Sequence, residues 1–234
     1  MARYVDGLSQ AEKRVLSEQI KNGAVPKKVQ DIVDPSLKGK GAIPETTIKN
    51  FPRDKTLTGE DAIIQEKAIR KYLADRDVML EEYLQKNSKI ANTDEARKLF
   101  KDVGYKGLNA AAVQEAASAL SKDAWKRLLE NEGDALIYAG GSGTGKTSSL
   151  KNVLPEDIEK AGAILDGNLS TMKSAKGRIA EARAKGKEPK IFYVYRKPVE
   201  SFVEGVVKRM KFNPEEGGRI VPTKVIAENH KGSH

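Results

Sequence analysis

Three short, mainly apolar runs in the second half of the chain are predicted to be strands, and the first of them is suited to a buried strand. They are Ala135–Ala139, Ala161–Leu165 and Lys190–Tyr195, and the last is dense in β-branched and aromatic residues. The stretches between them, Thr147–Val153 and Ser170–Lys185, have helical composition. The order strand, helix, strand, helix, strand predicts an α/β fold in which a parallel sheet is flanked by helices on both faces.

The first 92 residues lack this alternation of strands and helices and are predicted to form a helical and irregular arm. Ser9–Lys21 has the cap residues and apolar spacing of an amphipathic helix. Residues 24–57 contain four prolines, which leave no room for a long helix or a central strand. Thr58–Lys86 is predicted to be a long helix whose apolar stripe is either core or a docking face for a partner chain. Asn87–Asn92 is polar and is interpreted as a junction.

Residues 93–132 form a third predicted helical block. Gly104 and Gly107 interrupt it, and a strong helix then ends near Gly133. Trp125 lies beside leucines in that helix, so we expect a core residue and not a platform for stacking bases.

The first strand runs into Gly140-x-x-x-x-Gly145-Lys146-Thr147, the pattern of a phosphate-binding loop. Glycines let the backbone turn sharply so that its N–H groups point at an anion, and the helix that follows adds its positive end. Lys146 can reach the β- and γ-phosphates, and the Thr147 hydroxyl can ligate Mg²⁺. The predicted ATP-binding residues are Gly140, Gly141, Ser142, Gly143, Thr144, Gly145, Lys146, Thr147 and Ser148.

Asp166 ends the second predicted strand, and carboxyl ends of parallel strands share one edge of a sheet. Its carboxylate can accept the proton of an attacking hydroxyl or hold Mg²⁺; the alternatives are a helix N-cap or a turn residue before Gly167. The third strand ends in Tyr195-Arg196 without an acidic pair, which favours a kinase over a motor ATPase.

Arg209 and Arg219 flank a segment with two glycines that is interpreted as a lid. A lid arginine can stabilise the charge that spreads over the γ-phosphoryl group, although either residue can equally be a surface arginine. The residues predicted to contact the acceptor are Asn168, Ser170, Arg196 and Glu200.

Charge and composition indicate which classes of ligand the chain can bind. Residues 167–234 hold 15 Lys and Arg against 7 Asp and Glu, which suits an anionic small molecule such as a nucleotide or sugar nucleotide, or else is a solvated lysine-rich face. Nucleic acid stays an open but unsupported partner. The chain has no cysteine and no apolar run of membrane-spanning length, so we expect a cytoplasmic protein without membrane partners.

Several of these residues together resemble the zeta-toxin family of P-loop kinases. The resemblance rests on Gly140–Thr147, on Asp166, on Pro198-x6-Gly205-x3-Arg209 and on Arg219-Ile220-Val221-Pro222-Thr223. It implies an ATP-dependent kinase that in several members phosphorylates a hydroxyl of UDP-N-acetylglucosamine. It also implies that Lys146 and Thr147 hold ATP and Mg²⁺, that Asp166 is the general base, and that Arg209 and Arg219 are lid arginines.

The resemblance covers residues 93–234, predicted to be the kinase domain, and leaves residues 1–92 as a separate arm. The arm is interpreted as a linker from a larger parent polypeptide or as an inhibitory segment that replaces an antitoxin protein. Such kinases usually have more than three strands, so one interpretation is that the chain is truncated at its C-terminus. The alternative functions are a kinase of NAD or of a polynucleotide 5′ end, and a non-catalytic ATP-binding module of a phage or mobile-element protein.

Overall fold

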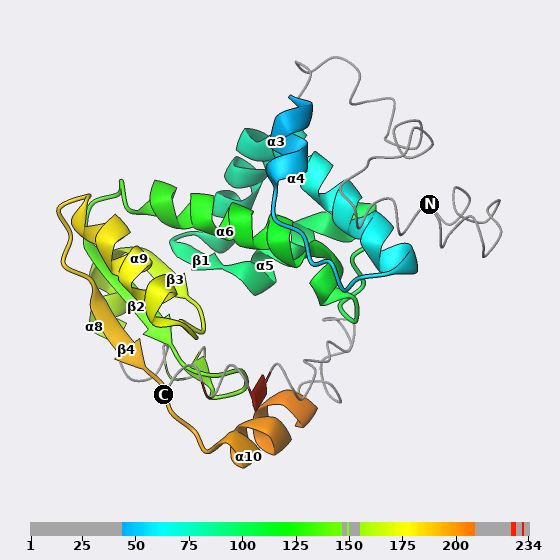
Figure 1. Ribbon diagram of the computed structural model, residues 1–234. Helices are drawn as coiled ribbons and strands as arrows, with labels where there is room; N and C mark the ends of the chain where they lie inside the picture. Colours follow the sequence, from blue (N-terminus) through cyan, green and yellow to red (C-terminus); the bar gives the residue numbers. More distant parts are fainter. Residues whose placement is uncertain (1–43, 147–148, 150–154, 209–225, 228–230, 232–234) are drawn as a thin grey trace. The chain divides into compact units, whose positions relative to one another are not determined.

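The computed structural model describes residues 44–146, 149, 155–208, 226–227 and 231 (Figure 1). The predicted helix Ser9–Lys21 lies outside these residues, as does most of Thr147–Val153. The chain divides into two compact units, Met1–Glu82 with Asp94–Leu120, and Tyr83–Thr93 with Ser121–His234. The predicted functional boundary between residues 92 and 93 stays a prediction.

The second unit contains a four-stranded, fully parallel sheet. Its strands are β1 (Ile90–Asn92), β2 (Asp134–Ala139), β3 (Ala161–Asp166) and β4 (Lys190–Tyr193), in the order β1-β3-β2-β4. β2 and β3 are buried along nearly their whole length, as expected of strands that are covered on both faces. The predicted α/β fold with a parallel sheet flanked by helices is confirmed.

The prediction of a polar junction over Asn87–Asn92 is wrong, because Ile90–Asn92 forms β1. This strand pairs with β3 in the register Ile90 to Ile164 and Asn92 to Asp166. Its middle residue, Ala91, is fully buried. A strand of three residues is too short to show an alternating pattern, so its pairing with β3, and not its own sequence, defines it.

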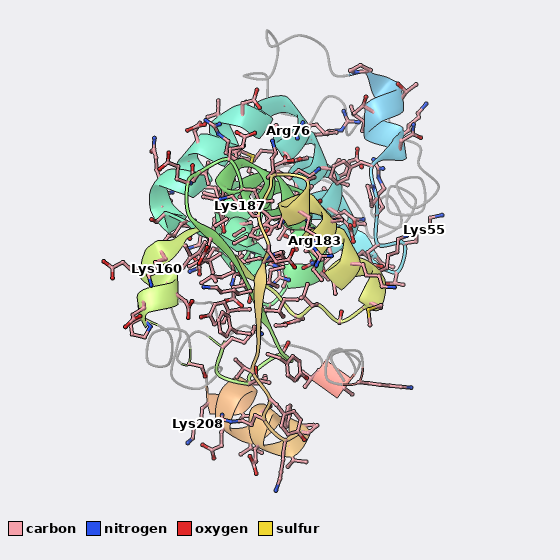
Figure 2. The ribbon with its side chains drawn as sticks, turned by 90° about the vertical axis from the view of Figure 1, so that its left-hand side faces the viewer. Lys55, Arg76, Lys160, Arg183, Lys187 and Lys208 are labelled. Carbon is pink, nitrogen blue, oxygen red and sulfur yellow. The ribbon has the colours of Figure 1, made fainter. Side chains whose placement is uncertain are left out.

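Helices cover both sides of the sheet in this unit. α8 (Pro155–Lys160) and α9 (Met172–Arg183) lie on opposite sides of the strands (Figure 2). Ile158 of α8 packs on a core cluster that includes Leu136 and Ile164. α9 begins where the Thr171 side chain accepts a hydrogen bond from the Ser174 N–H, which makes Thr171 the N-cap. The helix predicted for Ser170–Lys185 is therefore present with slightly shorter bounds.

After β4 the chain forms α10 (Pro198–Glu200) and then η5 (Ser201–Val207), a π-helix. Proline at the first helical position is a common start, since its missing N–H has no partner there in any case. π-Helices are rare and occur frequently at functional sites. This one packs against the phosphate loop, as described below.

The described residues of the first unit are mainly helical. Its helices are α3 (Glu45–Asn50), the Gly59–Glu82 part of α4 (Gly59–Asn87), most of α5 (Thr93–Arg97), η3 (Lys98–Val103), η4 (Ala110–Val113) and the start of α6 (Gln114–Leu128). The prediction that residues 24–57 are irregular is thus wrong for Glu45–Asn50, which form α3 directly after Pro44. η3 ends at Gly104, whose φ of 114° is a left-handed conformation suited to glycine.

The apolar stripe of α4 is buried and is not a free docking face. Its members are Ile64, Ala68, Tyr72, Met79 and Tyr83, each at most 5% exposed. α4 is not one straight helix, since Asp75 has non-helical backbone angles. Trp125 of α6 is fully buried, so the prediction of a core residue is confirmed. None of the helices in the described part of the chain is both long and apolar enough to cross a bilayer.

Two buried tyrosines differ in a way that predicts opposite effects on stability. The Tyr138 hydroxyl is buried without a hydrogen-bond partner in the described structure, and burial raises its pKa. The Tyr83 hydroxyl instead accepts from the Asn92 N–H at 2.8 Å and lies 3.0 Å from the Ile90 carbonyl oxygen. We expect Tyr138→Phe to leave the free energy of unfolding unchanged or to raise it, and Tyr83→Phe to lower it by about 1–3 kcal/mol. Urea denaturation measures both, and an equal loss in the two variants would contradict this account.

Candidate active site

The carboxyl ends of three strands bring the predicted chemical groups to one edge of the sheet. β2 leads into Gly140, β3 ends at Asp166, and β1 ends at Asn92. Tyr138 and Asn92 are the register partners of Asp166 on its two sides. This edge is where open parallel sheets bind their ligands.

Three glycines of the phosphate loop adopt backbone angles that favour glycine. The φ angles of Gly140, Gly143 and Gly145 are 145°, 80° and 88°. A Cβ atom on Gly140 would lie 2.4 Å from the Val194 carbonyl oxygen, and one on Gly143 would lie 2.4 Å from that of Ser201. At Gly145, apart from its two chain neighbours, no atom of the described residues lies within 4 Å of the corresponding position. The loop is therefore closely packed at Gly140 and Gly143.

Lys146 curls back over this loop. Its Nζ atom donates to the carbonyl oxygens of Gly140 at 2.9 Å and Gly141 at 3.2 Å, and to Asn168 Oδ1 at 3.2 Å. The Ser149 N–H donates to the Gly145 carbonyl oxygen at 2.9 Å, a hydrogen bond with the four-residue spacing of an α-helix. An ammonium group held by neutral oxygens at a helix start can exchange these partners for phosphate oxygens. The loop thus fits the phosphates of a nucleotide.

Asp166 lies half-buried beside this lysine-bearing loop. Its Oδ2 atom accepts a hydrogen bond from Asn92 Nδ2 at 2.8 Å. The next residue, Gly167, donates its N–H to the Tyr138 carbonyl oxygen at 3.1 Å. Asp166 does not cap α9, because Thr171 does, so the helix-cap alternative is wrong. A carboxylate at a strand end near a phosphate loop can serve as a base or as a magnesium ligand.

The residues present are compatible with Mg²⁺ but do not form a complete metal cage. No cluster of three or more His, Cys, Asp or Glu side chains occurs within the described residues. Mg²⁺ typically takes one or two protein carboxylates and completes its shell with water and phosphate oxygens. Asp166 can supply one such ligand. Thr147, the other predicted ligand, lies outside the described residues.

The remaining predicted site residues divide into two groups. Arg196 and Glu200 follow β4, where the Arg196 carbonyl oxygen accepts from Ser201 Oγ at 3.3 Å and Glu200 lies 4.0 Å from the Lys197 ammonium. Ser170 stands between β3 and α9, two residues after Asn168. The second group lies outside the described residues and comprises Thr147, Ser148, Arg209 and Arg219.

The structure adds two residues to the candidate site: Asn92, and Gly205, which the sequence analysis used only as part of the family resemblance. The η5 backbone packs directly on the phosphate loop, because a Cβ on Gly205 would lie 2.2 Å from the Gly143 carbonyl oxygen. Ser201, which approaches the same loop glycine, is fully buried. A glycine inside a helical stretch was the available signal for such a close approach. Asn92 carried no signal, since it belongs to a strand that was not predicted.

We expect Gly205→Ala to weaken ATP binding by about 10-fold, because a methyl group forced against the loop costs about 1–3 kcal/mol. Titration of the protein with a fluorescent ATP analogue measures this. Gly177→Ala in α9 is the matched control, since beyond its chain neighbours and its own helix backbone no described atom lies within 4 Å of the added methyl group, and alanine favours helix. Unchanged ATP affinity in Gly205→Ala would mean that the loop does not depend on η5.

Comparison with known proteins agrees with the chemistry of this edge. Residues 158–234 match the model of a protein family described as Zeta toxin, while a search of curated proteins finds no match. The matched segment contains Asp166 and Asn168 and begins after the phosphate loop. This family is P-loop kinase-like, which supports nucleotide binding and phosphotransferase chemistry at the coarse level. The resemblance of this chain to the zeta-toxin family is thereby confirmed over residues 158–234, and over residues 93–157 it stays a prediction.

Proposed function

We propose that this protein is an ATP-dependent kinase that transfers the γ-phosphoryl group to a hydroxyl of a sugar nucleotide, such as UDP-N-acetylglucosamine. The observation that carries the proposal is the hydrogen bond between Lys146 and Asn168. It joins the phosphate loop to the segment that follows Asp166, so a phosphate-binding cation and a candidate base belong to one site. The Zeta toxin match over this segment supports the same activity.

Each residue has a role in the proposed reaction. ATP, when bound, supplies the phosphoryl group. The N–H groups of Gly140–Lys146 bind its phosphates, and the Lys146 ammonium moves from the loop carbonyls to the phosphate oxygens. Asp166 accepts the proton of the acceptor hydroxyl. Thr147 would hold Mg²⁺, and Arg209 and Arg219 would stabilise charge on the transferred group. Ligation of Mg²⁺ by Asp166 is the alternative to its role as the base.

The acceptor is proposed to bind beside Asn168, Ser170, Arg196 and Glu200. The excess of basic residues after position 166 suits a substrate that already carries phosphate groups. Asn168 Oδ1 faces Lys146, so the acceptor would bind next to the cation that contacts the γ-phosphate. Proximity of the two reactants is the main contribution that a protein makes to phosphoryl transfer.

The test is incubation with ATP labelled at the γ-phosphate and three acceptors in separate reactions: UDP-N-acetylglucosamine, NAD and a DNA oligonucleotide. We expect label on the sugar nucleotide, and labelling at least about 100-fold slower in Asp166→Asn. Asp102→Asn is the matched control, since this exposed carboxylate pairs with Lys71 in the other compact unit. Label on NAD or the oligonucleotide would identify a different acceptor, and label on none would point to an ATP-binding module.

The proposed kinase activity also suggests where the protein acts and which macromolecule it binds. We propose that the reaction takes place in the cytoplasm, where sugar nucleotides and ATP are both present. An antitoxin protein or a larger parent polypeptide is the macromolecular partner that the zeta-toxin resemblance suggests. Affinity purification of the tagged chain from cells that carry its neighbouring genes would test this, with the Asp166→Asn variant used to avoid toxicity.

A further inference from the structure

We propose that Tyr83 and Asn92 are positioning residues that hold the Asp166 carboxylate at the phosphate loop. The segment Tyr83–Thr93 would then belong to the phosphotransfer unit, although it precedes both the phosphate loop and the Zeta toxin match. The inference rests on the proposed function, in which Asp166 is the base. It adds two residues, from α4 and β1, that support this base.

The first link is the side-chain contact between Asn92 and Asp166. Asn92 Nδ2 donates to Asp166 Oδ2 at 2.8 Å. The two residues are register partners at the ends of β1 and β3, which are parallel and adjacent. A hydrogen bond to one carboxylate oxygen fixes the rotation of the carboxyl group and therefore the direction of its other oxygen.

The second link holds Asn92 itself. Its backbone N–H donates to the Tyr83 hydroxyl at 2.8 Å, and its carbonyl oxygen lies 3.2 Å from the same hydroxyl. The Tyr83 hydroxyl also lies 3.0 Å from the Ile90 carbonyl oxygen. Tyr83 is fully buried, so its ring has little freedom to move. One phenol group thus contacts the backbone at both ends of β1.

The third link anchors the start of β1. The Lys89 carbonyl oxygen accepts the Ile164 N–H of β3 at 2.8 Å. The Lys89 ammonium donates to the carbonyl oxygens of Ile158 and Glu159 in α8. A strand of only three residues needs such additional contacts to keep its register. The division of the chain into compact units agrees, because it groups Tyr83–Thr93 with the sheet.

A direct readout of the proposed contact does not require activity. Carboxyl ¹³C NMR of aspartate-labelled protein at fixed pH reports the hydrogen bonding of Asp166, whose signal is identified by its loss in Asp166→Asn. We expect Asn92→Ala and Tyr83→Phe both to shift this signal. Asn109→Ala and Tyr72→Phe should leave it unchanged; Asn109 makes two comparable hydrogen bonds, to Lys106 and Gly104, in the other compact unit. An unshifted Asp166 signal in Asn92→Ala and Tyr83→Phe would overturn the inference.

Kinetics supply the second readout. Asn92→Ala should lower kcat by about 10- to 100-fold, because a small displacement of a reacting group is costly, while the KM for ATP stays within about twofold. The double variant with Tyr83→Phe should lose no more than Asn92→Ala alone, since both changes break one chain of contacts. Additive losses, or a fall in ATP affinity equal to the fall in kcat, would assign the two residues to general stability. If the wild-type protein labels no acceptor, the proposed function fails, and the NMR signal still decides whether Asn92 positions Asp166.

Discussion

Replacement of Asp166 with asparagine is expected to lower kcat by about 100- to 10,000-fold, the range that general-base catalysis contributes. The amide cannot accept a proton from the acceptor hydroxyl. It can still accept the hydrogen bond from Asn92 Nδ2 through its own oxygen, so the local geometry should survive. ATP affinity should therefore stay within about threefold of the wild-type value.

Single-turnover phosphoryl transfer and equilibrium ATP binding measure the two quantities separately. Binding with and without Mg²⁺ distinguishes a base from a metal ligand. If Asp166→Asn loses magnesium-dependent ATP binding to the same extent as turnover, Asp166 serves the metal or the fold and is not the base.

Replacement of Lys146 with methionine is expected to weaken ATP binding by about 10- to 100-fold, because hydrogen bonds to a charged group contribute about 1.5–3 kcal/mol each. Turnover should fall further, since the ammonium group also stabilises the charge that develops on the γ-phosphoryl group. Calorimetric titration with ATP and magnesium measures the first effect, and label transfer at saturating ATP measures the second.

Lys187→Met is the matched control for this variant. The Lys187 ammonium, labelled in Figure 2, also bonds to two backbone carbonyl oxygens, those of Asn131 and Gly133, but these precede β2 at its amino end. Its loss should lower stability and leave ATP affinity unchanged. An equal effect of Lys146→Met and Lys187→Met on ATP binding would contradict the assignment of the phosphate loop.

The strands that carry the phosphate loop and Asp166 could be predicted because each contains a five-residue run without charged side chains. Ala135–Ala139 and Ala161–Leu165 each fill a buried strand, and the structure extends each by one residue. β1 could not be predicted, because only Ala91 is fully buried among its three residues. Its last residue, Asn92, bonds to Asp166, which lies 74 positions further along the chain. Local sequence carries no information about such a pairing.

The residues of the candidate site also differ in whether the sequence alone could indicate them. The glycines and Lys146 could be identified because the loop encodes its own shape, and the structure gives positive φ angles at Gly140, Gly143 and Gly145. The contact of Gly205 with Gly143 and that of Asn92 with Asp166 depend on how distant segments pack. They became visible only with the fold.

The most direct test of the central claim is a crystal structure of the protein with a non-hydrolysable ATP analogue and Mg²⁺. We expect the triphosphate to lie against the backbone N–H groups of Gly140–Lys146, with Lys146 Nζ moved from the Gly140 and Gly141 carbonyl oxygens to the phosphate oxygens. A nucleotide bound elsewhere, with Lys146 still on these carbonyl oxygens, would contradict the account.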